Sequence, residues 1–280
     1  AARITDIENA IFREISKQIL EYERDLLLAN EFIANLDCFL HLYIMADKLN
    51  LSRPGEDDSA IIYDEGRNIL VEVDSSASYI KHSFSSYSFR EKIDRNIFII
   101  TGNVSSGKST FLREVATMIY LAQVGSYVPG KNFKTALFKK VLTNFEIYES
   151  NIDGLSGFTM ECKNLKFILD QIENLPGDDT NTLVILDDPY RRTSEINKRC
   201  LLAGTISHLN TIVSKNKNIK TFISIDRETL DFILNKDIID KSITNIYEMK
   251  TGHVRSNNNL STNNIPINLY ELINFQNSIQ

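Results

Sequence analysis

A short loop at residues 102–110 contains the residue types that bind phosphate. Two glycines, Gly102 and Gly107, bracket four residues and are followed directly by Lys108 and Ser109. Glycine lets consecutive backbone N–H groups turn inward, the lysine reaches the β- and γ-phosphates of a nucleotide, and the serine hydroxyl can hold Mg²⁺. This spacing is that of a P-loop, which predicts binding of a nucleotide. The residues expected to contact the nucleotide are Gly102, Asn103, Val104, Ser105, Ser106, Gly107, Lys108, Ser109 and Thr110.

The sequence on both sides of this loop supports the prediction. Four apolar residues, 97–100, precede it as in a buried strand, and apolar side chains recur at helical spacing after it, from Phe111 to Tyr120. A helix that begins at Lys108 adds its N-terminal dipole to the phosphate site. A chance glycine pattern would lack this order of strand, loop and helix. We therefore interpret the segment as a nucleotide-binding P-loop.

A second apolar run ends in two carboxylates. Residues 182–188 read Thr-Leu-Val-Ile-Leu-Asp-Asp, a pattern typical of a buried parallel strand. In P-loop ATPases an aspartate at the end of such a strand helps to hold Mg²⁺. We therefore predict that Ser109 and Asp187 bind Mg²⁺ and that Lys108 and Asp187 belong to the catalytic residues.

The elements that must position these residues alternate between strands and helices. A helix is predicted at residues 195–213 and a strand at 220–225. This order predicts an α/β fold of the P-loop NTPase kind, with a mostly parallel sheet flanked by helices. Upstream of the P-loop, short strands are predicted at 61–63 and 68–73, and a serine-rich surface loop at 75–88.

A long helix or a pair of helices is predicted for the first part of the chain. From Ile4 to Tyr43 apolar residues recur every three or four positions, with charged residues on the opposite face. We expect the apolar stripe to face a core. Turn-rich and polar segments then divide the chain into a helical connector (1–54), a P-loop ATPase domain (55–255) and a polar loop with a short C-terminal segment (256–280).

The composition is that of an ordinary folded protein. The chain has 280 residues, of which 42% are hydrophobic and 24% charged, and its net charge of −6 argues against coating DNA by electrostatics alone. The three cysteines lack metal-ligand spacing, so we expect buried free thiols in a reducing, intracellular compartment. Apolar runs stay short of the ~18 residues that suggest a membrane span, so membrane insertion is not expected. Because residue 1 is alanine, we expect a fragment of a longer protein.

Residues 106–113 read Ser-Gly-Lys-Ser-Thr-Phe-Leu-Arg, and residues 122–129 read Ala-Gln-Val-Gly-Ser-Tyr-Val-Pro. These two strings resemble the C-terminal part of the MutS family, ATPases of DNA mismatch repair and meiotic recombination. Nucleotide chemistry does not require the second string, so it separates this family from other P-loop proteins. Residues 66–72 resemble the start of the family's ATPase domain, and residues 36–54 resemble the end of its helical lever. The resemblance covers roughly residues 10–230.

The resemblance implies a dimer with ABC-like composite sites for ATP and Mg²⁺. The partner would be a second copy or another MutS-type subunit, and each site would take a signature serine in trans, a position that Ser156 matches. A serine at a helix start is also an ordinary cap. Asp188 stands where the family has the glutamate that polarises the attacking water, which adds Asp188 to the catalytic residues. DNA contacts would come from regions largely absent from this chain, and a eukaryotic member would be nuclear.

Three places depart from the family pattern. Val104 replaces an asparagine of the P-loop, residues 190–193 (Tyr-Arg-Arg-Thr) replace Gly-Arg-Gly-Thr, and Asp226 replaces the histidine that senses the γ-phosphate. A carboxylate at that position repels phosphate unless it is protonated or turned away. Because catalysis of phosphoryl transfer depends on positioning, we expect ATP binding with slow hydrolysis.

Three functions are open on the sequence alone. The first is the ATPase module of a MutS-like repair or recombination protein, which couples nucleotide state to the conformation of a dimer and a DNA clamp. The second is a degenerate subunit that holds nucleotide and supports a more active partner. The third is an ABC-type DNA-maintenance ATPase outside MutS. Residues 155–158 are similar to the signature sequence of that class, but residues 122–129 argue against it.

Overall fold

The computed structural model of the chain describes residues 2–74, 79–88, 92–145, 157–175, 181–249 and 267–268. The chain divides into two units, Ala1–Asn50 and Leu51–Gln280. This division falls a few residues before the boundary predicted after residue 54. The predicted C-terminal segment 256–280 lies outside the described residues except for Ile267–Asn268.

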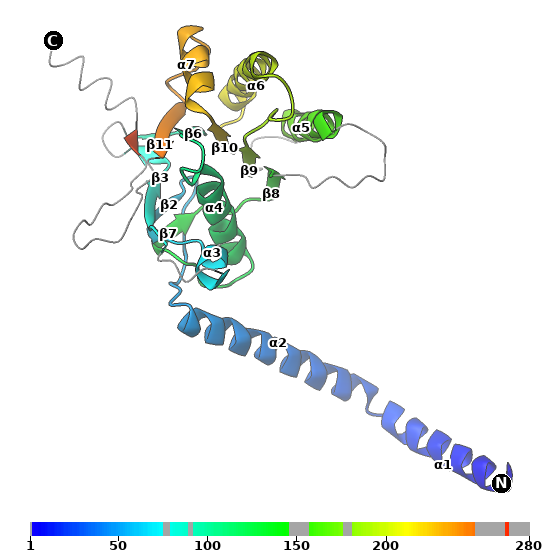
Figure 1. The fold of residues 1–280 in the computed structure, drawn as a ribbon. Helices are drawn as coiled ribbons and strands as arrows, with labels where there is room; N and C mark the ends of the chain where they lie inside the picture. The colour runs from blue at the N-terminus through cyan, green and yellow to red at the C-terminus, as the bar shows by residue number, and fades with distance from the viewer. Residues whose placement is uncertain are drawn as a thin grey trace. The chain divides into compact units, whose positions relative to one another are not determined.

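The first unit consists of two consecutive helices, α1 (Ala2–Leu20) and α2 (Glu23–Lys48), which confirms the predicted helical pair. Most of their apolar side chains are exposed: Ile15 is 50% exposed, Leu26 53% and Ile33 62%. The expectation that this stripe faces a core is therefore wrong within this unit. The reason is that α1 and α2 follow each other end to end and cannot cover one another (Figure 1).

The second unit is built on a six-stranded sheet in the order β12-β11-β6-β10-β9-β8. The strands from β8 to β11 in this sheet are parallel, and β12 pairs with β11 in the antiparallel sense. Every residue of β6, β9 and β10 is buried, as expected for strands covered on both faces. This confirms the predicted α/β fold. The strands are β6 (Ile97–Gly102), β8 (Lys140–Asn144), β9 (Thr182–Asp187), β10 (Ile219–Ile225), β11 (Thr244–Met249) and β12 (Ile267–Asn268).

Helices cover both faces of this sheet (Figure 1). Successive side chains of a strand point to opposite faces. Ile97 and Ile99 of β6 therefore join the core beneath α5, α6 and α7, whereas Phe98 and Ile100 join the core beneath α4. The helix predicted at 195–213 and the strand predicted at 220–225 are confirmed as α6 and β10. The helices are α4 (Lys108–Gln123), α5 (Gly157–Glu173), α6 (Glu195–Lys215) and α7 (Arg227–Asn235).

A smaller, four-stranded sheet shares the core of α4. Its order is β1-β7-β2-β3, with β1 (Gly55–Glu56), β2 (Ile62–Gly66), β3 (His82–Ser85) and β7 (Lys131–Thr135); β4 (Tyr87–Ser88) and β5 (Ile93–Asp94) form a separate pair. The predicted strand at 61–63 corresponds to β2. The surface loop predicted at 75–88 is wrong for residues 82–88. His82 and Phe84 are buried while the serines between and after them take the alternate positions, so the serine content obscured a half-buried strand.

Residues 69–74 form a short helix, α3 (Ile69–Asp74), where a strand was predicted. The side-chain oxygen of Asn68 accepts the N–H groups of Leu70 at 3.2 Å and Val71 at 3.4 Å, so Asn68 caps the helix. Its amide nitrogen donates to the carbonyl oxygen of Thr110 at 3.2 Å. The cap and this link to the P-loop helix override the β-type residues of the segment.

Two further expectations concern the cysteines and the membrane. The three cysteines are free, but Cys38 and Cys200 are exposed and Cys162 is half-buried. The expectation of buried thiols is wrong because Cys38 and Cys200 occupy exposed positions of α2 and α6. Within the described part of the chain, no helix has the length and apolar character needed to cross a membrane.

Candidate nucleotide-binding site

The P-loop connects the end of β6 to the start of α4. Gly102 has a φ of 149° and Gly107 a φ of 95°, which are conformations that favour glycine. The first N–H groups of α4 have no partner inside the helix, and with the helix dipole they favour an anion. Val104, which departs from the family pattern, is exposed in this loop. The loop therefore has the backbone of a phosphate site.

We expect the two glycines of the loop to respond differently to alanine. A Cβ at Gly102 would lie 2.4 Å from the carbonyl oxygen of Met249 and 2.8 Å from Ser106 Oγ, whereas a Cβ at Gly107 would meet nothing within 4 Å. Gly102→Ala should lower the free energy of unfolding by about 2–3 kcal/mol, and Gly107→Ala by about 1 kcal/mol through backbone strain alone. Urea denaturation of the two variants measures the difference. Equal losses would contradict the steric argument.

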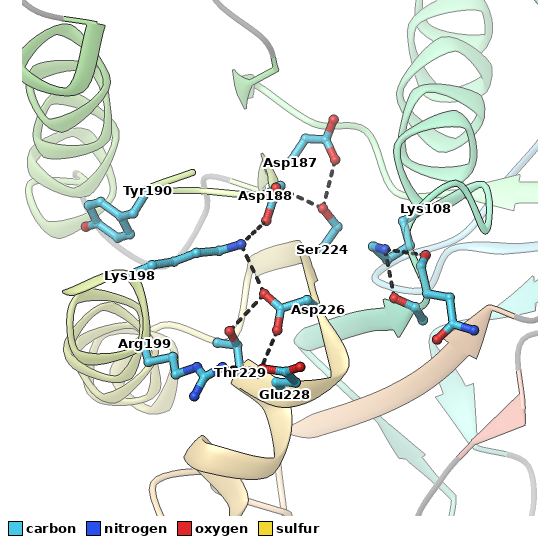
Figure 2. Close-up of polar contacts among 12 residues, drawn as sticks. Lys108, Asp187, Asp188, Tyr190, Lys198, Arg199, Ser224, Asp226, Glu228 and Thr229 are labelled. Atoms are coloured by element: carbon cyan, nitrogen blue, oxygen red, sulfur yellow. Dashed lines mark hydrogen bonds and ion pairs between the residues drawn. The ribbon is translucent and has the colours of Figure 1, made fainter. Parts of the chain in front are cut away.

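Lys108 lies across the loop (Figure 2). Its Nζ donates to the carbonyl oxygens of Gly102 and Asn103, both at 2.9 Å. Burial lowers the pKa of Lys108 below its ordinary value, while Asp188, Asp226 and Asp187 act in the opposite direction. A phosphate oxygen is a stronger acceptor than a neutral carbonyl. Lys108 can therefore exchange these bonds for bonds to a nucleotide.

Asp187 ends β9 beside the P-loop. Ser109 Oγ and Ser224 Oγ donate to Asp187 Oδ1 at 2.9 Å and 2.8 Å. Strand β10 lies between β6 and β9, and its register pairs Ser224 with Asp187. A carboxylate and a hydroxyl fit Mg²⁺, which prefers oxygen ligands and keeps water and phosphate oxygens in its shell. Among the described residues there is no group of three or more His, Cys, Asp or Glu side chains that could hold a metal ion.

Lys108, Ser109 and Ser224 open onto a pocket of about 670 Å³. That volume lies in the range of small-molecule sites. Its position at the carboxyl ends of parallel strands is the usual ligand position in α/β sheets. The lining includes residues 102–105, Lys108, Ser109, Asp188, Lys198, Ser224 and Asp226.

Asp188 and Asp226 share one lysine in this pocket. Lys198 Nζ of α6 lies 2.8 Å from Asp188 Oδ1 and 3.0 Å from Asp226 Oδ2 (Figure 2). Burial alone would lower the pKa of Lys198, but the hydrogen bonds to Asp188 and Asp226 raise it above its ordinary value. Lys198 therefore carries its charge into the site.

Asp226, which stands where the resemblance places the family's histidine, lines the pocket with both side-chain oxygens already paired. Its Oδ1 accepts the N–H of Thr229 at 2.7 Å and its Oδ2 accepts the Thr229 hydroxyl at 2.8 Å, so Asp226 caps α7. Partial burial alone would raise the pKa of Asp226, but the bonds from Thr229 and Lys198 lower it below its ordinary value. A phosphate would therefore meet a charged carboxylate that is already paired.

The segment after Asp187 is held in an unusual backbone conformation. Asp188 has a φ of 47° and Tyr190 a φ of 64°, although neither is glycine. The N–H of Asp188 donates to Ser224 Oγ at 2.8 Å, and the N–H of Tyr190 donates to Glu161 Oε1 at 2.7 Å. The buried Tyr190 ring adds a hydroxyl contact with Thr205 Oγ1 at 2.9 Å. These contacts stabilise the strained turn and fix the backbone position of Asp188.

The structure places the P-loop, Ser109, Asp187 and Asp188 at one edge of the sheet, whereas Ser156 lies outside the described residues. Sequence reasoning missed Ser224 and Lys198. Ser224 carried a signal, because it lies at the carboxyl end of a predicted parallel strand. Lys198 carried none, since its role depends on where α6 packs.

A P-loop after a buried parallel strand, an aspartate at the end of a nearby strand and helices on both faces define a P-loop ATPase domain. Comparison with known proteins then identifies the family. Residues 98–259 match MutS domain V, and the chain belongs to the MutS family.

Relatives in this family are DNA mismatch repair proteins. The chain is 27% identical over 258 residues to the DNA mismatch repair protein MutS of Methanococcoides burtonii (85% of this chain and 28% of that protein). It is 30% identical over 194 residues to the MutS protein of Protochlamydia amoebophila (69% and 21%). It is 31% identical over 197 residues to the DNA mismatch repair protein MSH3 of Vanderwaltozyma polyspora (67% and 18%). The chain thus spans less than a third of the length of these relatives.

Proposed function

We propose that this chain is the ATP-binding module of a MutS-like protein of DNA mismatch repair or recombination. The observation that carries the proposal is the junction between the P-loop and β9, where Ser109 of the loop helix donates to Asp187 at 2.9 Å. Lys108 neutralises charge on the β- and γ-phosphates, Ser109 and Asp187 hold Mg²⁺, and Asp188 positions the attacking water. Bound Mg²⁺ neutralises further charge on the phosphates.

Hydrolysis is slow in this proposal. Asp188 is one methylene shorter than the glutamate that it replaces, so it reaches less far toward a nucleotide. Asp226 offers a carboxylate where the family has an imidazole N–H donor, and that carboxylate already accepts bonds from Thr229 and Lys198. Positioned donors supply most of the stabilisation in phosphoryl transfer, so their loss lowers turnover more than binding.

ATP acts between two subunits, with Ser156 of one completing the site of the other. Contacts to DNA come from parts of the parent protein outside this chain, which carries a net charge of −6. Binding of Mg-ATP then changes the conformation of the dimer and, through it, the contacts of the parent protein with DNA.

Sedimentation velocity of the chain with Mg-ATP, with ADP and with EDTA tests this proposal. We expect a dimer only with Mg-ATP. Ser156→Arg places a bulky cation in the proposed interface, and we expect this variant to bind ATP but to remain monomeric. A chain that neither binds Mg-ATP nor dimerises would refute the proposal.

A second candidate is a degenerate subunit that binds ATP without turnover and supports an active partner. The ion pairs of Lys198 with Asp188 and Asp226 favour it, because both carboxylates are occupied. Turnover of wild type beside Asp188→Ala separates the two candidates. Equal, background rates favour the degenerate subunit, and a lower rate in the variant favours the slow ATPase.

A further inference from the structure

We infer that Lys198 holds Asp188 in an inhibitory ion pair, which keeps ATP turnover low while ATP binding is retained. This inference rests on the proposed function as an ATP-binding module. It adds a regulatory role for a lysine that no sequence motif marks.

The ion pair is built into the fold from three elements. Asp188 follows β9, Lys198 lies in the first turn of α6, and Asp226 caps α7 (Figure 2). The Lys198 side chain is 7% exposed, whereas the Asp188 side chain is 37% and the Asp226 side chain 31% exposed. The Lys198 side chain is thus the most buried of the three, and both carboxylates contact its ammonium.

Each partner is fixed from a second direction. Asp226 accepts the N–H and the hydroxyl of Thr229, so it anchors Lys198 to the start of α7. Asp188 has a left-handed backbone conformation and donates its N–H to Ser224 Oγ. The backbone atoms from which its side chain projects are therefore fixed. A nearly buried ammonium is costly to leave unpaired. The ion pair between Lys198 and Asp188 therefore persists through thermal fluctuations of the side chains.

This contact opposes the chemistry proposed for Asp188. In hydrolysis the water oxygen bonds to the γ-phosphorus, the bond from that phosphorus to the bridging oxygen breaks, and ADP leaves with the bridging oxygen. The water proton passes through the accepting carboxylate to the phosphate that is formed. An ammonium 2.8 Å from Asp188 Oδ1 occupies that oxygen, so the carboxylate has fewer acceptor positions left for the water.

A direct contact between Lys198 and the γ-phosphate fits the geometry less well. To reach a phosphate, Lys198 would have to leave two carboxylates at 2.8 Å and 3.0 Å. Both carboxylates line the pocket and would then face the triphosphate without their counter-ion. The ion pair therefore also lets two aspartates lie near the nucleotide site.

The test frees Asp188 without changing the charge of the trio. Lys198→Met with Asp226→Asn removes one positive and one negative charge, and asparagine retains the capping of α7. The matched control is Lys220→Met with Asp94→Asn, which removes another buried lysine pair, joined at 2.6 Å and absent from the pocket lining. ATP affinity is measured with a fluorescent ATP analogue, and hydrolysis in single turnover with Mg-ATP.

We expect the Lys198→Met/Asp226→Asn variant to bind ATP as wild type does and to hydrolyse it about 10-fold faster or more, since a positioned base contributes on the order of 100-fold. Adding Asp188→Ala should return the rate to background. The control pair should leave the rate unchanged. An unchanged rate at equal ATP affinity overturns the inhibitory pair and leaves the proposed function standing.

Two other outcomes of this experiment would overturn the inhibitory ion pair. A folded variant that has lost ATP affinity would show that Lys198 contacts phosphate, which overturns the inference. A wild-type chain that binds no ATP would overturn the proposed function and the inference with it.

Urea denaturation without nucleotide is an independent measurement of the ion pair. Lys198→Met alone should lower the midpoint more than the double variant, because it leaves two carboxylates uncompensated, and equal midpoints would count against the pair.

Discussion

Replacing Lys108 with methionine should weaken Mg-ATP binding about 100-fold. Methionine keeps the length of the side chain but removes the ammonium, and the loss of a charge-assisted hydrogen bond costs about 2–3 kcal/mol, where 1.4 kcal/mol is a factor of ten. The ammonium reaches across the loop to Gly102 and Asn103, where a triphosphate would lie. Calorimetric titration with Mg-ATP measures the change.

Two controls make this result specific to the P-loop. Lys166→Met removes an exposed lysine of α5, and we expect it to retain wild-type affinity. Urea denaturation of both variants checks that the fold survives the loss of the two loop contacts. Wild-type affinity in Lys108→Met would show that the loop does not hold the phosphates.

Replacing Phe84 with alanine should lower the free energy of unfolding by about 3–5 kcal/mol. Phe84 belongs to the small sheet, but its ring lies 5.2 Å from Phe98, 5.3 Å from Phe222 and 5.5 Å from Tyr247, measured between centroids, and these three residues belong to the large sheet. The ring is buried, so its removal leaves a cavity where the two sheets meet. Urea denaturation followed by circular dichroism measures the loss.

The matched control is Phe167→Ala in α5. Phe167 is 56% exposed, so its truncation should change stability by no more than about 0.5 kcal/mol. A loss in Phe84→Ala as small as that of the control would mean that the contacts of Phe84 add little to the stability of the domain.

The large sheet was predictable because its strands have a strong local pattern. Strands β6 and β9 contain continuous apolar runs, and such runs between helices indicate a parallel sheet covered on both faces. The small sheet was less predictable. The strand with His82 and Phe84 contains serines at its alternate positions, and the largely apolar residues 69–73 belong to a helix whose cap depends on one asparagine side chain.

The sequence by itself determined the chemistry of the P-loop and the strand that carries Asp187. Glycine spacing, a lysine, a serine and an apolar run are local features, and each restricts the backbone or supplies a donor over only a few residues. The tertiary structure alone decided the environment of Asp188. Lys198 and Asp226 lie 10 and 38 residues further along the chain, and they meet Asp188 only because α6 and α7 pack beside the end of β9. An ion pair among three elements leaves no periodic signal in the sequence, since its energy depends on distance and burial, which only the packed fold defines.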